Sequence, residues 1–229
     1  MKTAALVLGA GRGARLGGAV PKAFVALRGR TLLERSLAIL AEIDEIDVVQ
    51  PVLAEADLDR VNVKDFDFGE RIANPVPGGV ERQDSVAAGL AALPGDVELI
   101  AVHDAARCLV APDDVRRVLA EARRYGAALL AVPARDTIKR VRGGEVIETP
   151  ERSTCWVAQT PQVFHAGLLV EALEKARHEG RLGTDDAELV ERLGVTVRIV
   201  EGRASNIKIT LPEDLRLAEM LLGEGEGGA

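Results

Sequence analysis

Short apolar runs and longer amphipathic stretches alternate along the chain. The apolar runs are bounded by glycine, proline or charged residues, which is typical of strands that are buried on both faces of a sheet. They predict strands at 4–10, 46–52, 98–104, 127–132, 195–202 and 206–210. Elsewhere apolar residues recur at helical spacing and predict helices at 31–42, 84–93, 112–126, 166–180, 184–194 and 212–223. This order predicts a single α/β domain over 1–229, a three-layer α/β/α sandwich on a mostly parallel sheet.

The ends of several predicted helices carry residues that satisfy free backbone groups. Thr31 and Glu34 stand three residues apart at the start of the first helix, which is the spacing of a capping box. Pro112 suits the first turn of the third helix, and Gly126 follows its last turn. Thr184 is the expected N-cap of the fifth helix.

Two segments do not fit the alternation of strands and helices. Polar and apolar residues alternate on both sides of Gly143 and Gly144, which predicts a β-hairpin arm at about 137–156. An isolated hairpin is marginally stable in water, so its apolar residues need a cover. These residues are Ile138, Val141, Val146 and Ile147. The glycine-rich end at 223–229 predicts a flexible tail.

The composition excludes several classes of protein. A net charge of −7 argues against a general nucleic-acid binder, and an aromatic content of 3% argues against a surface that stacks single-stranded bases. Cys108 and Cys155 are too few for a disulfide framework or a zinc site. The sequence shows no signal peptide and no apolar run of membrane-spanning length. We therefore expect a cytoplasmic protein without nucleic-acid or membrane partners.

A glycine-rich loop follows the first predicted strand in the stretch LVLGAGRGARLGGAVPKAF. Gly9, Gly11 and Ala14 fit the dinucleotide-binding fingerprint, but that fingerprint needs a helix to begin at once. Gly17 and Pro21 interrupt any such helix, which disfavours a NAD-type site. The loop also lacks the Lys-Ser/Thr pair of a P-loop.

The same loop carries the bases Arg12, Arg15 and Lys22 close to the end of the strand. Backbone N–H groups and cations in a flexible loop are suited to a triphosphate. Open α/β sheets bind ligands at the carboxyl ends of their strands, where this loop lies. The loop therefore predicts a nucleotide site, and a purely structural glycine turn is the alternative.

Five stretches identify the family that the chain resembles. LGAGRGARLG with PKAF resembles the signature loop of nucleotidyltransferases that activate a sugar or polyol phosphate. Four further stretches together resemble 2-C-methyl-D-erythritol 4-phosphate cytidylyltransferase. They are PGGVERQDSVAAGL, VHDAAR, the series RDTIKR…ER…W…QTPQVF, and EGRASNIKITLPEDL. The resemblance implies a Rossmann-like nucleotidyltransferase fold. It also implies transfer of CMP from CTP to 2-C-methyl-D-erythritol 4-phosphate, with release of pyrophosphate, in the non-mevalonate route to isoprenoid precursors.

The resemblance also implies roles for individual residues around CTP. The CTP-binding positions are Gly9, Ala10, Gly11, Gly13, Arg15, Lys22, Gly79, Ser85 and Asp104. The catalytic cations are Arg15, Lys22 and Lys208, and Asp104 is the ligand expected to orient Mg²⁺ or another divalent cation. The alternatives are a solvated lysine at Lys208, a helix cap at Asp104 and another helix cap at Asp84 and Ser85.

The acceptor is expected to lie against a second set of residues. By resemblance these are Arg107, Thr137, Arg152, Thr160 and Ser205. Many relatives have an acidic residue where this chain has Ser205, whose hydroxyl can hydrogen-bond to the acceptor but does not carry the charge. This difference bears on the affinity for the acceptor and on its identity. The resemblance further implies a homodimer in which the arms cross and donate Thr137 and Arg152 to the partner's site.

The chemistry of this reaction determines which types of side chain the active site needs. The nucleophile is a phosphate oxygen that is already anionic at neutral pH, so the reaction needs cations and no general base. We accordingly expect His103 to have no catalytic role. Two further hypotheses remain: a cytidylyltransferase for another polyol phosphate such as ribitol phosphate, and a nucleotide-binding regulatory module without turnover.

Overall fold

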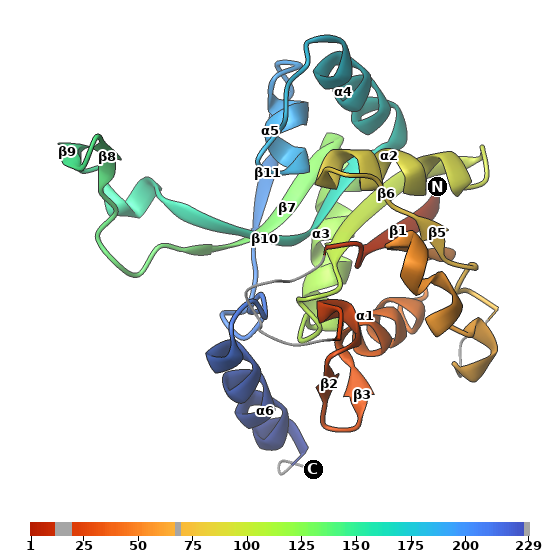
Figure 1. Cartoon of the computed structure of the whole chain (residues 1–229). Coiled ribbons are helices and arrows are strands. Elements are labelled where there is room, and N and C mark those ends of the chain that lie inside the picture. Colours follow the sequence, from red (N-terminus) through yellow and green to blue (C-terminus); the bar gives the residue numbers. More distant parts are fainter. Residues whose placement is uncertain (12–19, 67–69, 227–229) are drawn as a thin grey trace.

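A seven-stranded sheet forms the centre of the protein in the computed structural model (Figure 1), which describes residues 1–11, 20–66 and 70–226. The strand order is β11-β7-β10-β6-β1-β4-β5. All these strands run parallel except β10, which is antiparallel to both of its neighbours. Their bounds are β1 (Lys2–Leu8), β4 (Val48–Leu53), β5 (Val76–Pro77), β6 (Val97–Asp104), β7 (Ala127–Pro133), β10 (Trp156–His165) and β11 (Arg198–Glu201).

Helices cover both faces of this sheet. They are α1 (Leu32–Ala41), α2 (Arg82–Ala92), α3 (Pro112–Tyr125), α4 (Ala166–His178) and α5 (Asp186–Glu191). The last helix, α6 (Pro212–Glu226), belongs to a separate small cluster. The helices α1 and α3 share one buried cluster with the sheet, whereas α2, α4 and α5 share the other. The predicted three-layer α/β/α sandwich is therefore confirmed. In the described part of the chain, no helix has the length and apolar character needed to cross a bilayer.

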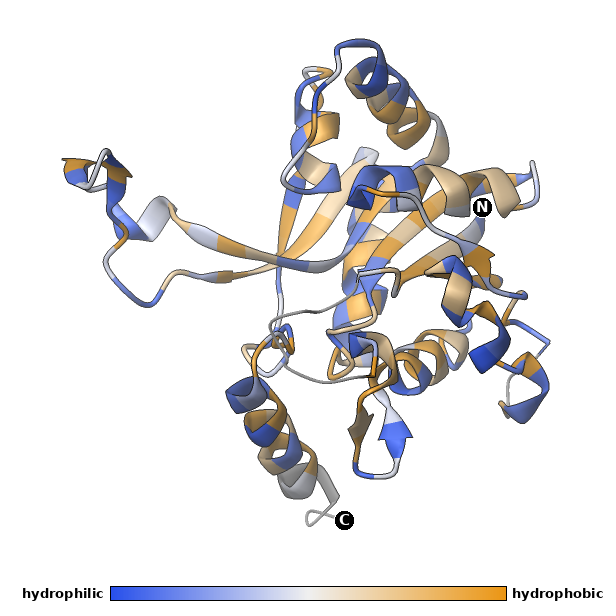
Figure 2. Ribbon diagram, viewed as in Figure 1, coloured by the Kyte–Doolittle hydropathy of each residue, from blue (hydrophilic) through white to orange (hydrophobic). Residues whose placement is uncertain are grey.

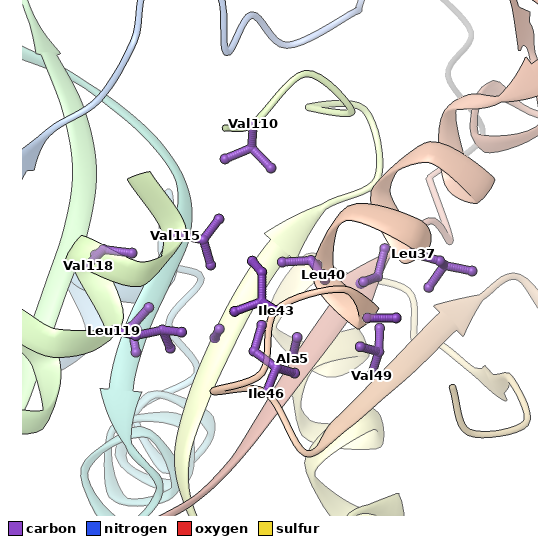
Figure 3. Close-up of a cluster of buried hydrophobic side chains, with 14 of the residues drawn as sticks. Ala5, Leu37, Leu40, Ile43, Ile46, Val49, Val110, Val115, Val118 and Leu119 are labelled. Carbon is purple, nitrogen blue, oxygen red and sulfur yellow. The ribbon is translucent and has the colours of Figure 1, made fainter. Parts of the chain in front are cut away.

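The core is mostly aliphatic, as the low aromatic content requires, and Phe164 is its one fully buried aromatic side chain among the described residues. Figure 3 shows Leu37 and Leu40 of α1 near Ala5 and Val49 of the sheet, whereas Val118 of α3 lies on the other side of the same cluster. Neighbouring residues along the middle of β1 and β6 belong to opposite clusters, because successive side chains of a strand point to opposite faces. In Figure 2 the strands of the central sheet are accordingly mostly coloured as hydrophobic.

Local signals placed most helix ends correctly. The capping box is present, since Glu34 N donates to Thr31 Oγ1 and Thr31 N donates to Glu34 Oε2. Gly126 has a φ of 91° and ends α3 in the left-handed conformation. The prediction for α5 is wrong by one residue, because Asp185 rather than Thr184 accepts the capping hydrogen bond from Glu188 N.

Two predictions for the sheet are wrong. The segment 206–210 is not a strand: it has no ladder partner and is held instead by side chains and by single backbone bonds. The central strand β10 was not predicted, because the polar residues Gln159, Thr160 and Gln162 interrupt its apolar pattern. All three are buried, and each has a hydrogen-bonding partner.

The predicted arm is shorter than expected. It consists of β8 (Arg140–Arg142) and β9 (Glu145–Glu148) around Gly143 and Gly144, whose φ values are 59° and 88°. Figure 1 shows the hairpin reaching far from the sheet, and Val141, Val146 and Ile147 on it are exposed. Trp156, assigned to the arm, begins β10.

The C-terminal helix and a small ribbon form a satellite of the sandwich. The ribbon pairs β2 (Ala26–Leu27) with β3 (Arg30–Thr31), and a small cluster joins it to α6. The short turns of helix are η2 (Lys22–Phe24), η3 (Glu55–Arg60), η4 (Val63–Asp65) and η5 (Arg152–Thr154). The helix α6 continues to Glu226, so 223–226, the first part of the predicted tail, are helical.

Candidate active site

A cleft of about 220 Å³ lies where β1 and β6 end. Its walls are the residues after β1, the glycine pair before α2, the end of β6 and the segment before α6. Of the ten residues predicted to bind CTP or to act in catalysis, eight line it: Gly9, Ala10, Gly11, Lys22, Gly79, Ser85, Asp104 and Lys208. The other two, Gly13 and Arg15, lie with Arg12 in 12–19, outside the described residues.

Close packing explains the glycine at the end of β1. Gly9 N donates to Val52 O at 2.8 Å, which continues the parallel pairing of β1 with β4. A Cβ at Gly9 would stand 2.7 Å from Leu53 Cδ2 and 3.2 Å from Ala23 Cβ. The absence of a side chain therefore lets the backbone at the end of β1 pack directly against Leu53 and Ala23 at the edge of the cleft.

The second wall of the cleft is a glycine turn bound to the first turn of α2. Ser85 Oγ accepts a hydrogen bond from Gly79 N at 3.1 Å and donates to Glu81 O at 3.3 Å. Asp84 accepts from Glu81 N at 3.1 Å, so Asp84 supports the start of the helix as the alternative hypothesis proposed. Ser85 lies inside α2, lines the cleft and fixes the turn.

Asp104 is the acidic centre of the cleft. It ends β6, is 8% exposed, and pairs with Lys208 Nζ at 2.7 Å and Arg82 Nε at 3.5 Å. Burial alone would raise the pKa of Asp104, but Arg82 and Lys208 outweigh burial and hold this pKa well below its usual range. The carboxylate is therefore ionised at neutral pH. No helix follows it at 105–110, so the helix-cap alternative is wrong.

Lys208 reaches Asp104 from an irregular segment that is fixed on both sides. Ile209 N donates to Ala106 O at 2.9 Å, and Ile209 is fully buried. The amide of Asn206 donates to Gln159 Oε1 at 3.1 Å and to Thr160 O at 3.0 Å. These contacts place Lys208 in the cleft without a strand, while its side chain remains 43% exposed.

His103 lies behind the end of β6 and is fully buried. Asp104 N donates to Thr160 Oγ1 at 3.1 Å, so the Thr160 hydroxyl can donate to His103 Nδ1, also at 3.1 Å. Burial lowers the pKa of His103 to about 4, which leaves the ring neutral. These contacts make His103 part of the support beneath Asp104 rather than a lining residue of the cleft.

The structure does not bring the five predicted acceptor residues into the cleft of one chain. Arg107 donates to Asn206 O at 2.8 Å and to Ala158 O at 3.2 Å, and Thr160 is buried beneath Asp104. Thr137 and Arg152 are exposed at the base of the arm, where Arg152 Nη1 donates to Arg135 O at 3.3 Å. Ser205 precedes Asn206 and, like the other four, does not line the cleft.

Sequence reasoning missed Arg82, which also lines the cleft. The stretch ERQDS contains it, but an arginine in the first turn of a helix resembles an ordinary surface residue. It also missed Asn206, whose amide holds the segment that carries Lys208. Among the described residues, no group of three or more His, Cys, Asp or Glu side chains is arranged to hold a metal ion.

Comparison with known proteins identifies the family. The family model for 2-C-methyl-D-erythritol 4-phosphate cytidylyltransferase matches residues 3–224. The chain belongs to this cytidylyltransferase family. A 2-C-methyl-D-erythritol 4-phosphate cytidylyltransferase of Symbiobacterium thermophilum is 44% identical over 220 residues, which are 96% of this chain and 92% of the relative.

Solved structures of the same cytidylyltransferase family share the fold. A 4-diphosphocytidyl-2C-methyl-D-erythritol synthase from Anaerococcus prevotii has a TM-score of 0.85 at 30% identity, over 97% of this chain and 96% of that one. The cytidylyltransferase from Thermus thermophilus has a TM-score of 0.79 at 38% identity, over 95% of this chain and 98% of that one. The resemblance expected from the five motifs is thus confirmed over nearly the whole chain, in favour of a cytidylyltransferase over a regulatory module.

Proposed function

We propose that this chain transfers CMP from CTP to 2-C-methyl-D-erythritol 4-phosphate and releases pyrophosphate. The observation that carries the proposal is the convergence of Lys22, Asp104 and Lys208 with two glycine turns in one cleft. The family relationship supplies the identity of both substrates. The product is the CDP-alcohol, an intermediate of isoprenoid precursor biosynthesis.

The reaction is a substitution at the α-phosphorus of CTP. An oxygen of the acceptor phosphate forms a new bond to that phosphorus, while the bond to the oxygen of the β-phosphate breaks and pyrophosphate leaves with its electron pair. Both reactants are anions, so the site must lower their repulsion and stabilise the charge that builds up in the transition state. Lys22 and Lys208 are the described lysines that line the cleft, and we assign this role to them together with Arg15.

We assign the nucleotide to the two glycine turns. Ala10 and Gly11 line the cleft, and we assign their backbone N–H groups to the ribose and phosphates, with Gly13 next but one in the sequence. The N–H of Gly9 is bonded to Val52 O, so Gly9 contributes close approach of the backbone instead. The turn at Gly79, which Ser85 fixes, offers backbone groups to the cytosine edge. Small residues on both walls favour close approach of a flat pyrimidine.

Asp104 fits Mg²⁺ as a single protein ligand. Mg²⁺ prefers carboxylate oxygens and is often held by one or two carboxylates together with substrate phosphates and water. The two oxygens of Asp104 face Lys208 and Arg82, which keep the carboxylate ionised for such a role. When bound, Mg²⁺ would neutralise phosphate charge beside the two lysines.

The acceptor part of the proposal involves a second copy of the chain. Thr137 and Arg152 lie outside the cleft of their own chain, at the base of an arm that reaches away from the sheet. We propose that they complete the acceptor site of a partner subunit in a homodimer. In that arrangement Arg107, Thr160 and Ser205 serve the acceptor from the chain that also binds CTP. A cytoplasmic location is consistent with this function.

Pyrophosphate release tests the proposal. The purified chain is supplied with CTP, Mg²⁺ and each of several polyol phosphates, and we expect release with 2-C-methyl-D-erythritol 4-phosphate. Release only with ribitol phosphate would replace the proposed acceptor. CTP binding without release for any acceptor would overturn the proposed activity.

A further inference from the structure

Arg82 joins the cleft to a buried carboxylate at the start of α5. Its Nη1 donates to Asp186 Oδ2 at 2.6 Å, and its Nε lies 3.5 Å from Asp104 Oδ1. Asp186 is 1% exposed, and it lies 104 positions from Arg82 in the sequence. One guanidinium therefore faces two carboxylates, one structural and one in the proposed active site.

The segment that carries Asp186 is fixed to its surroundings by amide side chains. Gln83 Nε2 donates to Arg181 O at 3.1 Å, and Gly183 N donates to Gln83 Oε1 at 3.2 Å. Gln162 of β10 donates to Asp185 Oδ2 at 2.8 Å and accepts from Ala187 N at 3.0 Å. Asp186 is thus held against both α2 and the sheet, and it is a fixed anchor for Arg82.

Holding two helices together does not require an ion pair at this place. Burying charges costs desolvation free energy, and apolar contacts of similar volume are often at least as stabilising. Stability alone therefore does not explain the ion pair between Arg82 and Asp186. The contact of Arg82 with Asp104 offers an explanation. Arg82 and Lys208 approach different oxygens of Asp104, so together they fix both the position and the direction of that carboxylate.

We propose that Arg82, anchored by Asp186, is a positioning residue that holds Asp104, and through Asp104 the ammonium of Lys208, in the geometry needed for nucleotidyl transfer. This inference rests on the proposed function for the role of Lys208. Small displacements of catalytic groups are costly, since a shift of about 1 Å can lower a rate roughly 100-fold. A rigid second layer behind Asp104 prevents such a shift.

The test replaces both members of the pair in the full-length protein. The double variant Arg82→Gln/Asp186→Asn leaves no unpaired charge, and its two amides can still hydrogen-bond to each other. We expect its melting temperature to exceed that of either single variant, because removing one partner alone strands a buried charge. We expect kcat to remain at least tenfold below that of the unchanged protein, since no cation at position 82 faces Asp104.

Binding of CTP alone, in EDTA, provides a readout that needs neither acceptor nor metal. By calorimetry we expect several-fold weaker CTP binding in the double variant, because Asp104 has lost one of the two cations that offset its charge beside the triphosphate. If the unchanged protein binds CTP but transfers to no acceptor, the proposed function fails while this measurement still decides the role of Arg82. Unchanged CTP affinity together with unchanged kcat would overturn the inference.

A control and a conservative variant separate positioning from general stability. Asp57 is also buried and pairs with Arg60 at 2.8 Å, outside the cleft, so Asp57→Asn/Arg60→Gln should leave kcat and CTP affinity unchanged.

Arg82→Lys keeps the charge, but a single ammonium cannot contact both carboxylates as the guanidinium does. We expect Arg82→Lys to fold and to have a reduced kcat. A kcat equal to that of the unchanged protein would contradict the inference even if the double variant did not fold.

Discussion

Asp104 and Lys208 neutralise each other before any substrate is present. The phosphates of CTP then compete with Asp104 for the ammonium of Lys208, and a cation bound to the phosphates would compete with Lys208 for Asp104. The 2.7 Å contact therefore helps to keep the Asp104 carboxylate ionised and holds the two groups close together in the free protein. It leaves their charges available when the two anionic substrates enter.

Replacing Lys22 tests where its charge acts. We expect Lys22→Ala to lower kcat by roughly 100- to 1,000-fold and to change the KM for CTP much less, because the ammonium is assigned to charge that develops in the transition state. Steady-state kinetics with CTP varied at saturating acceptor measure both constants. A raised KM at unchanged kcat would place Lys22 in ground-state binding instead.

Replacing Asp104 tests its assignment as the Mg²⁺ ligand. Asp104→Asn keeps the shape of the side chain but removes the charge that attracts a hard cation. We expect the Mg²⁺ concentration for half-maximal activity to rise and activity at saturating Mg²⁺ to fall. The residue is at a strand end, so we expect the fold to remain intact, which thermal melts would check. An unchanged Mg²⁺ dependence would show that Asp104 does not hold the ion.

Single residues of the site were predictable where a motif gathered them, and not where only tertiary contacts did. Lys22, Asp104 and Lys208 stand in recognisable stretches and line one cleft as expected. Arg82 has no such signal, because its anchor Asp186 is distant in the sequence. A buried ion pair between two helices depends on how those helices pack, which the local sequence pattern does not encode.

At the scale of elements, the two glycine turns set the width of the cleft. A Cβ at Gly78 would stand 2.7 Å from Ser85 Oγ and 2.8 Å from Ala10 Cβ, so it would press α2 and the loop after β1 apart. Gly95, beyond the other end of α2, has nothing within 4 Å of its Cβ position. These two glycines make a matched pair for the same substitution.

We expect Gly78→Ala to raise the KM for CTP several-fold and to lower the melting temperature, because the displaced turn carries the groups assigned to cytosine. We expect Gly95→Ala to leave the KM unchanged and to move the melting temperature little. Steady-state kinetics and thermal melts on both variants measure the difference. Equal KM values for CTP in the two variants would show that the turn at Gly78 does not contribute to CTP binding.

Elements with a strong local signal were predicted well, and elements whose partners are distant were not. Thr31 with Glu34 and Gly126 mark helix ends through bonds made within a few residues. The strand β10 contains Gln159 and Gln162, which are buried only because distant side chains and backbone groups satisfy them. The segment that carries Lys208 has an apolar alternation typical of a strand, but in the sheet β11 already lies beside β7.

At the scale of the whole molecule, the arm is the feature that a single chain leaves unexplained. Its exposed apolar residues Val141 and Val146 gain nothing from the sandwich, since the hairpin lies far from it (Figure 1). Transfer of such residues into an interface is favourable. A second copy of the chain is the cover that we propose, and it would bring Thr137 and Arg152 near a second cleft.

Complementation between two inactive variants tests this shared site. Lys22→Ala and Arg152→Ala homodimers should each be poorly active. When they are unfolded together and refolded as an equal mixture, half of the dimers should contain one chain of each kind. Each mixed dimer then has one site with both lesions and one intact site, so about a quarter of all sites should regain activity.

The comparison depends on proof that mixed dimers form. Two different affinity tags on the variants allow the mixed dimers to be purified, and about half of the sites in that fraction should be active. Each homodimer, refolded alone, controls for recovery caused by refolding itself. If Arg152 serves the cleft of its own chain, every site in the mixed dimer keeps one lesion. Purified mixed dimers without recovered activity would then reject the donation of Arg152 to the partner.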